Sequence, residues 1–390
     1  GQVTRVGEIA IEGNLLTRDK VIRRELELGP GDLISREKML RSQHRLYRLG
    51  VFRSVRVSHE PMADADAEQR RLVVRVEEAP PLVYSVGVGY DTDRGFQGSF
   101  STSHDNLGGR VRTLGIQAFV SETLRRAQIV GSEPRLFGRN LPTLIDYSTE
   151  YREDPGYTMD RRSTAIRVDR RLNEAWTGYV RYNYQRQDLS DVSDPAAPED
   201  EKLENLQLGD IGVTLIRDRR DDPLMTTHGT HFTVTARVFN EYLLSESDFV
   251  KSRVAASGSW SFAIGTSFAS SVRLGGLTTY GSTTAVAISE RFFAGGQSTI
   301  RGFELDEVGP QEDGRPIGGE ASLILNQEFR FPVWGRFGGV LFYDVGNVYQ
   351  ELSDFDAFDV RHVLGADLRI LSQLDNLDCD AGNHRQRGAS

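Results

Sequence analysis

Residues 82–91 read LVYSVGVGYD, and this short stretch shows the pattern that dominates the chain. Tyrosine or valine occupies every second position from 84 to 90, while serine, glycine or aspartate occupies the alternate positions from 85 to 91. Successive side chains of a β-strand point to opposite faces, so the stretch predicts a strand with one apolar face and one small, polar face. The same alternation recurs in residues 231–238, 321–330 and 364–370.

Two kinds of protein contain such strands. In a soluble sandwich the apolar face meets a second sheet, whereas in a membrane barrel it meets lipid and the polar face lines a wet lumen. Fifteen strands can be placed, at 83–91, 95–104, 109–120, 124–133, 142–152, 160–170, 175–188, 206–217, 229–240, 250–262, 266–279, 317–331, 337–345, 360–371 and 374–381. The long connections (189–205, 241–249, 280–316 and 346–359) all follow odd-numbered strands. Long loops at one end and short turns at the other are typical of a barrel, so the sequence predicts a mainly β fold, a transmembrane antiparallel β-barrel.

The first 80 residues have a different pattern, β-α-α-β-β. A strand is expected at 6–11, a helix capped by Thr17 and a second helix capped by Ser35 follow, and two alternating runs at 52–58 and 71–77 pair as a hairpin. The chain therefore divides into a small α+β domain at 1–80 and a barrel at 81–390. Either 6–11 or 52–58 is expected to be an edge strand of the sheet. Two roles remain open for this domain: its edge strand binds incoming peptides by β-augmentation, or the domain is only a spacer that positions the barrel.

Composition excludes several classes of function. A net charge of −9 argues against nucleic acid as the main partner. The single cysteine, Cys379, excludes an internal disulfide framework, and the seven dispersed histidines predict no metal site. The sequence contains no phosphate-binding loop and no hydrolase or metalloprotease motif. We therefore expect that the protein binds no cofactor and is not an enzyme.

Four motifs in the second domain suggest a family. Residues 295–303 read GGQSTIRGF, 218–223 read DRRDDP with Gly229 beyond, 342–347 read FYDVGN, and 328–332 read EFRFP. In this order they resemble the BamA/TamA superfamily of outer-membrane assembly factors, also known as bacterial surface antigen barrels. The first 80 residues resemble a POTRA domain, the periplasmic module that precedes these barrels.

The resemblance also suggests a site. In that family the loop carrying the arginine folds back into the barrel and meets acidic residues on the inner wall. The alternation places Glu328 and Asp344 on the lumen face of adjacent strands, so we expect Arg301 to pair with both. Gly302 and Phe303 are expected to serve the turn and its packing. This contact either pins the loop permanently or opens during a working cycle.

A second family motif corresponds to a turn. Its residues are Asp218, Arg220, Asp221, Pro223 and Gly229.

The resemblance implies a protein of the outer membrane of a Gram-negative bacterium, with its N-terminal domain in the periplasm. It would insert or translocate outer-membrane proteins without nucleotide, by opening the seam between its first and last strands. The implied partners are nascent outer-membrane or secreted polypeptides, the lipid bilayer, and periplasmic accessory proteins such as Bam lipoproteins or a TamB-like protein. Two alternatives remain open: a two-partner-type secretion pore, and a barrel that anchors an upstream patatin-like lipase domain.

The sequence departs from the family at its end. The family barrel closes with sixteen strands, whereas here the fifteenth is followed only by the polar residues 383–390. The sixteenth strand is therefore expected to be missing, so that the chain is a fragment or its seam closes in another way.

Overall fold

The computed structural model describes residues 4–62, 68–192, 205–223, 226–263, 265–335 and 337–370. The strand expected at 374–381 and Cys379 lie outside these residues. Contacts divide the chain into two compact units: residues 1–89, 96–121 and 125–148 form one, and residues 90–95, 122–124 and 149–390 form the other. In the described part of the chain, no helix is long and apolar enough to cross a membrane.

The N-terminal domain has the predicted order of elements. It contains β1 (Arg5–Glu12), α1 (Asp19–Arg23), α2 (Arg36–Tyr47), β2 (Phe52–Pro61) and β3 (Gln69–Glu78). In its three-stranded sheet β3 is central, with β1 parallel and β2 antiparallel to it. Both candidate edge strands are therefore edges. The larger of its two apolar clusters joins both helices to the sheet and contains Ile22, Leu46, Val51, Phe52, Val55, Val74 and Val76.

Of the two predicted helix caps, Thr17 is wrong and Ser35 is confirmed in position. The first helix has Arg18 at its N-cap position, because the carboxylate of Glu78 binds the preceding turn: it accepts hydrogen bonds from the backbone N–H groups of Leu16 (2.8 Å) and Thr17 (2.6 Å). Ser35 does occupy the N-cap position of α2, but its side chain accepts no capping hydrogen bond. The second helix ends before Gly50, whose φ of +76° favours glycine.

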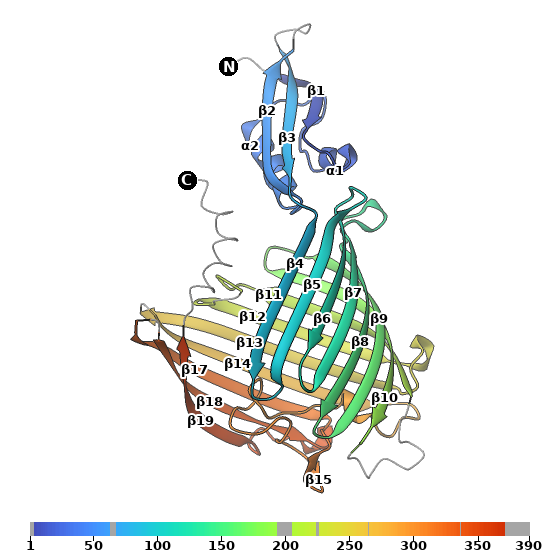
Figure 1. Cartoon of the computed structure of the whole chain (residues 1–390), viewed down its shortest axis with the longest axis vertical. Coiled ribbons are helices and arrows are strands. Elements are labelled where there is room, and N and C mark those ends of the chain that lie inside the picture. Colours follow the sequence, from blue (N-terminus) through green and yellow to red (C-terminus); the bar gives the residue numbers. More distant parts are fainter. Residues whose placement is uncertain are drawn as a thin grey trace. The chain divides into compact units, whose positions relative to one another are not determined.

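The remaining strands form one 14-stranded sheet (Figure 1). In chain order they are β4 (Leu82–Asp91), β5 (Gly95–Leu107), β6 (Arg112–Val120), β7 (Leu124–Glu133), β8 (Thr143–Asp154), β9 (Tyr157–Arg171), β10 (Trp176–Ser190), β11 (Leu206–Asp218), β12 (Gly229–Phe239), β13 (Phe249–Ala263), β14 (Thr266–Thr279), β17 (Ala321–Trp334), β18 (Phe337–Tyr349) and β19 (Arg361–Ile370). Each strand pairs with its neighbours in sequence, apart from two short strands inside the loop between β14 and β17. These elements match the first fourteen predicted strands in order.

Exposure shows which face of the sheet is inside. On β11, Ile211, Val213 and Leu215 are about half exposed, whereas Asp210 and Thr214 are buried. The apolar side chains therefore face outward, and the small and charged ones face inward, as in a barrel with a polar lumen.

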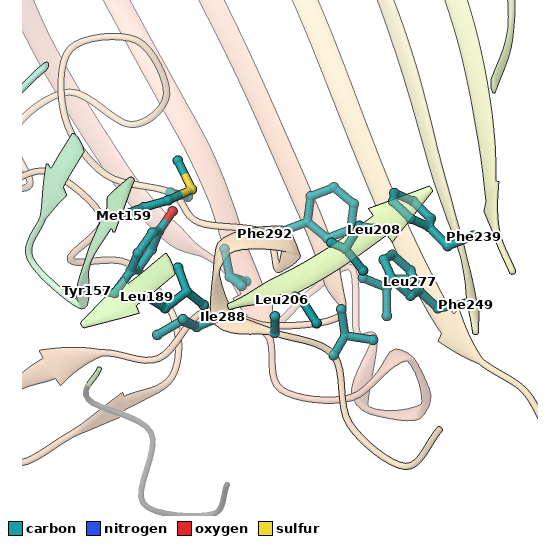
Figure 2. Packing of buried hydrophobic residues seen from close by; sticks show 14 of the residues in the cluster. Tyr157, Met159, Leu189, Leu206, Leu208, Phe239, Phe249, Leu277, Ile288 and Phe292 are labelled. Atoms are coloured by element: carbon teal, nitrogen blue, oxygen red, sulfur yellow. The ribbon is translucent and has the colours of Figure 1, made fainter. Parts of the chain in front are cut away.

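The inward face changes character at the end of the sheet that carries the long connections. There it bears large apolar side chains, which pack against the loop between β14 and β17 in one buried cluster (Figure 2). The strands contribute Tyr157, Met159, Leu189, Leu206, Leu208, Phe239, Phe249, Leu277, Ile324 and Val348, and the loop contributes Val286, Ala287, Ile288, Phe292, Ala294, Ile300 and Val308. An inner face of small and polar residues was expected. This end differs because the loop covers it and excludes water.

Candidate functional site

The loop between β14 and β17 has a defined internal structure. At its base, Phe292 and Gly319 exchange two backbone hydrogen bonds of 2.8 and 3.0 Å. Ala294 forms a further bridge with Val308, and the far end of the loop is a small hairpin of β15 (Gln311–Glu312) and β16 (Arg315–Pro316). Gly295 has φ +122°, and a Cβ at this position would lie 2.3 Å from the carbonyl oxygen of Glu304. Only glycine fits where the loop doubles back on itself.

This backbone places Arg301 against the inner face of β17 and β18. Its Nε and Nη2 donate to the two carboxylate oxygens of Asp344, at 2.7 and 2.8 Å. Its Nη1 donates to Oε1 of Glu328 at 2.8 Å. The planar guanidinium thus forms a two-point contact with one carboxylate and a third bond to the other, a geometry that a lysine ammonium cannot reproduce.

The Asp344 carboxylate is completely enclosed. Its side chain is 0% exposed, and it also accepts hydrogen bonds from the Asn326 amide (2.8 Å) and from the Arg301 backbone N–H (3.1 Å). These bonds, and above all those to the guanidinium, compensate the cost of burying the charge. The bonds to Asp344 and Glu328 raise the pKa of Arg301 above its usual value, so the arginine stays charged.

Glu328 belongs to a more exposed part of the same network. Arg330 donates two hydrogen bonds to its Oε2, at 2.8 and 2.9 Å, and Arg369 from β19 donates to Oε1 at 3.2 Å. Asp367, also on β19, lies 3.6 Å from Arg301. Glu328 therefore has hydrogen bonds from three arginines, whereas the one arginine that donates to Asp344 among the described residues is Arg301.

Sequence reasoning did not find the bonds of Arg330 and Arg369 to Glu328, nor the contacts of Asn326, Phe342 and Asp367. Asn326 lies opposite Asp344 in the register of β17 and β18, and the ring of Phe342 lies under the Arg301 guanidinium, 3.8 Å from its Cζ. Phe342 is two residues before Asp344, so the alternation places both on the inner face. That alternation was the sequence signal for Phe342. The same alternation on β19 places Asp367 on the inner face. Asn326 needed the strand register.

Gly302 and Phe303 lie where the loop turns away from Arg301. Gly302 has φ +89°, and a Cβ there would come within 3.1 Å of Val363 on β19. Phe303 is partly buried against the large apolar cluster. Neither residue contributes a polar group to the network; both shape the turn and its packing.

The second motif forms a separate turn between β11 and β12. Arg220 donates to both carboxylate oxygens of Asp218, at 2.9 and 2.6 Å, and to the carbonyl of Pro223 at 3.2 Å. Asp221 accepts hydrogen bonds from Thr227, and these lower the pKa of Asp221 to about 2. Because Asp218 ends β11, this turn lies at the opposite end of the sheet from the long connections. The structure therefore does not bring the two motifs together.

The long loop borders a polar cavity of about 1780 Å³. Its charged lining includes Arg273, Arg301, Glu328, Arg330, Asp367 and Arg369. Among the described residues, no group of three or more His, Cys, Asp or Glu side chains is placed to hold a metal ion. The contacts that the site does show are ion pairs and hydrogen bonds.

A sheet whose apolar face points outward, with a loop folded against its polar inner face, has the architecture of a membrane β-barrel. An Omp85 superfamily domain model matches residues 106–378, and a model for the surface antigen variable number repeat, POTRA, matches residues 4–79. The first match covers more than half of the chain, which therefore belongs to the Omp85 superfamily. The predicted fold, a transmembrane β-barrel with one POTRA domain before it, is confirmed.

Similar proteins include several named as outer membrane protein assembly factor BamA. The one from Nitratidesulfovibrio vulgaris is 28% identical over 390 residues, which covers 96% of this chain and 48% of the relative. The one from Neisseria meningitidis is 26% identical over 384 residues, 90% of this chain and 47% of the relative. The chain thus spans about half the length of the curated relatives it matches.

Solved structures support the same fold. BamA from Haemophilus ducreyi lacking POTRA domains 1–3 has a TM-score of 0.84 at 18% identity, covering 95% of this chain and 79% of that one. CdiB from Acinetobacter baumannii has a TM-score of 0.54 at 13% identity, covering 95% of this chain and 68% of that one.

Proposed function

We propose that the protein is an outer-membrane protein assembly factor that inserts other β-barrels into the bacterial outer membrane. The observation that carries this proposal is that relatives named as BamA match almost the whole chain, across both the POTRA domain and the barrel sheet. The arginine loop folded against the inner face supports it, because the loop's ionic contact leaves the outer surface of the sheet clear.

The physical mechanism starts at the end strands. Among the described residues, β4 and β19 are the two ends of the strand order. A backbone edge that is unpaired in lipid costs several kcal/mol for each group, so pairing it with a strand of an incoming protein is favourable. Folding of the substrate then supplies the free energy, and no nucleotide is needed.

The arginine contact has a role in that cycle. Arg301 holds the loop to β17 and β18, close to the end of the sheet at which an incoming strand would pair. With the loop attached, these strands are held together from inside, so that opening at the edge does not spread into the rest of the sheet.

Location and partners follow from this proposal. The POTRA domain lies in the periplasm and receives nascent outer-membrane polypeptides, which add to the exposed edge of β1 or β2. Periplasmic accessory proteins assist, and the lipid bilayer is the medium of insertion. The protein is not an enzyme.

The test is reconstitution of the full-length protein in vesicles of phosphatidylethanolamine and phosphatidylglycerol. A urea-unfolded, eight-stranded outer-membrane protein is added, and its folding is followed by the gel shift of the heat-resistant barrel. We expect folding several-fold faster than in empty vesicles, and slower folding with Arg301→Ala. Folding should be unchanged with Arg315→Ala, which removes an exposed ion pair to Asp191 and hydrogen bonds to the carbonyls of Pro155 and Asp191. A rate equal to that of empty vesicles would overturn the proposal.

The likeness to CdiB structures favours a second candidate, a pore that passes an unfolded polypeptide through the lumen. The same vesicles distinguish the two. A secretion pore makes an added polypeptide inaccessible to external protease without inserting it into the bilayer, whereas an assembly factor leaves the product embedded in the membrane.

A further inference from the structure

A second buried charge in the long loop has no part in the arginine contact. Glu290 ends the short helical turn η4 (Ile288–Glu290), and it is only 3% exposed. Its Oε1 accepts a hydrogen bond from the Gln185 side chain of β10 (2.8 Å), and its Oε2 accepts one from Lys251 of β13 (3.0 Å). Arg237 of β12 lies 3.6 Å from the same oxygen.

Glu290 completes a network that reaches four consecutive strands. Arg237 also donates to both oxygens of Asp210 on β11, at 2.9 and 2.6 Å, and Asp210 accepts from Asn183 on β10 at 3.1 Å. Burial by itself would raise the pKa of Glu290, but Lys251 and Arg237 hold it below its usual value, so the group is a carboxylate.

The charge count shows why Glu290 matters to this network. Two cations (Arg237 and Lys251) meet two carboxylates (Asp210 and Glu290), so the charges of the network balance. Loss of the Glu290 charge leaves a net charge of +1 on these groups, with Arg237 and Lys251 close together. Like charges in a buried site repel strongly because the low-dielectric surroundings screen them little.

Glu290 and Arg301 attach the loop to different parts of the sheet. Glu290 binds residues of β10, β12 and β13, whereas Arg301 binds residues of β17 and β18. Between them along the chain lies the base of the loop, where Phe292 pairs with Gly319. Arg291 strengthens this base by donating to the carbonyls of Val286 (2.9 Å) and Ile317 (3.1 Å).

We propose that Glu290 is a positioning residue that keeps the first segment of the loop, residues 286–292, attached to β10–β13 when the Arg301 contact opens. Movement is then confined to residues 293–318, and the loop returns to the same place after each opening. The link to a working cycle rests on the proposed assembly function, but the attachment itself does not.

Hydrogen exchange of the full-length protein in lipid nanodiscs tests the attachment without any substrate. With Arg301→Ala, we expect exchange in 297–305 to rise by about 100-fold or more, while 286–291 stays within about threefold of wild type. With Glu290→Gln, exchange in 286–291 should rise by about 100-fold or more. The proposal is overturned if Arg301→Ala loosens both segments equally, or if Glu290→Gln leaves 286–291 protected.

A charge-balanced double variant separates positioning by charge from simple packing. Lys251→Met combined with Glu290→Gln restores the balance of charge, and the methionine can pack on Phe292, whose ring lies 5.4 Å from the Lys251 ammonium in the wild type. Protection of 286–291 should return to within about tenfold of wild type. If Glu290→Gln does not fold, a double variant that folds with this protection supports the proposal. A double variant as labile as the single one refutes it.

The assembly assay then has an independent outcome. If the exchange pattern is as expected but no substrate is assembled, the proposed function fails and the two-contact attachment stands. If assembly occurs and the exchange pattern differs, the reverse holds.

Discussion

Arg301→Ala removes the guanidinium and leaves both carboxylates in place. Glu328 keeps Arg330 and Arg369 as partners, but Asp344, with a fully buried side chain, keeps only the Asn326 amide and one backbone N–H. The variant should therefore fold as a barrel with a loop that opens far more often.

The expected rise in loop opening follows from the loss of the ion-pair partner of Asp344. Breaking a buried ion pair by removal of one partner costs about 3–5 kcal/mol. Because each 1.4 kcal/mol is a factor of ten in an equilibrium, the population of the open loop should rise roughly 100- to 4,000-fold.

Thermolysin digestion of the protein in nanodiscs measures that population. The protease cleaves before large apolar residues, and Ile300 is fully buried while the loop is attached. When the loop recloses faster than it is cut, the cleavage rate follows the open population. A heat-resistant gel shift shows in parallel that the barrel remains folded.

A double-mutant cycle makes the test specific to the ion pair. With Arg301→Ala, Asp344→Asn and their combination, the coupling free energy should be about 2 kcal/mol or more. The exposed pair of Arg315 and Asp191, treated in the same way, should give at most about 1 kcal/mol. A cleavage rate for Arg301→Ala within about threefold of wild type, or equal couplings for the two pairs, would refute the reasoning.

Three further outcomes are expected. Burial and the neighbouring charge of Asp154 raise the pKa of Asp306 in the loop to about 7. Protection of residues 303–308 against hydrogen exchange should therefore weaken as the pH rises from 3.8 to about 7. Asp306→Asn should remove this pH dependence. Phe239→Ala, which empties a fully buried site under the loop, should lower stability to urea by about 3–5 kcal/mol with the strand structure unchanged in circular dichroism. Burial alone would raise the pKa of Glu78, but the hydrogen bonds from Thr17 outweigh burial, so the pKa lies below its usual value. The contribution of Glu78 to the stability of the N-terminal domain is therefore complete above pH 4.5 and is lost as the pH falls. Glu78→Gln should make the thermal stability of this domain less dependent on pH in the acid range.

Much of the fold was predictable because strand alternation is a local property. Fourteen strands appear in the predicted order, and the alternation placed Glu328 and Asp344 on one face of adjacent strands. The family motif supplied Arg301. Those two sources were enough to name the three side chains that meet in the structure.

Contacts between distant residues were beyond the same reasoning. Thr17 is not a helix cap, because the carboxylate that binds its backbone is 61 residues away in Glu78. Glu290 meets Gln185, which is 105 residues away, and neither residue belongs to a motif that announces the contact. On three strands, a large apolar side chain stands at an inward-facing position where the alternation calls for a small or polar one: Phe239, Phe249 and Leu277. This exception to the alternation was the one local sign that the loop covers them.

The sequence by itself determined the strands, their order and their two faces, since a pleated backbone sends successive side chains to opposite sides whatever else surrounds it. Only the tertiary structure decided what the inner face meets. The loop between β14 and β17 makes that face apolar at the long-loop end, pairs Arg301 with Asp344 and Glu328, and buries Glu290 beside Lys251. A buried charge is stable only where its counter-charge and hydrogen-bond partners are brought to it, and the folding of the whole chain places them there.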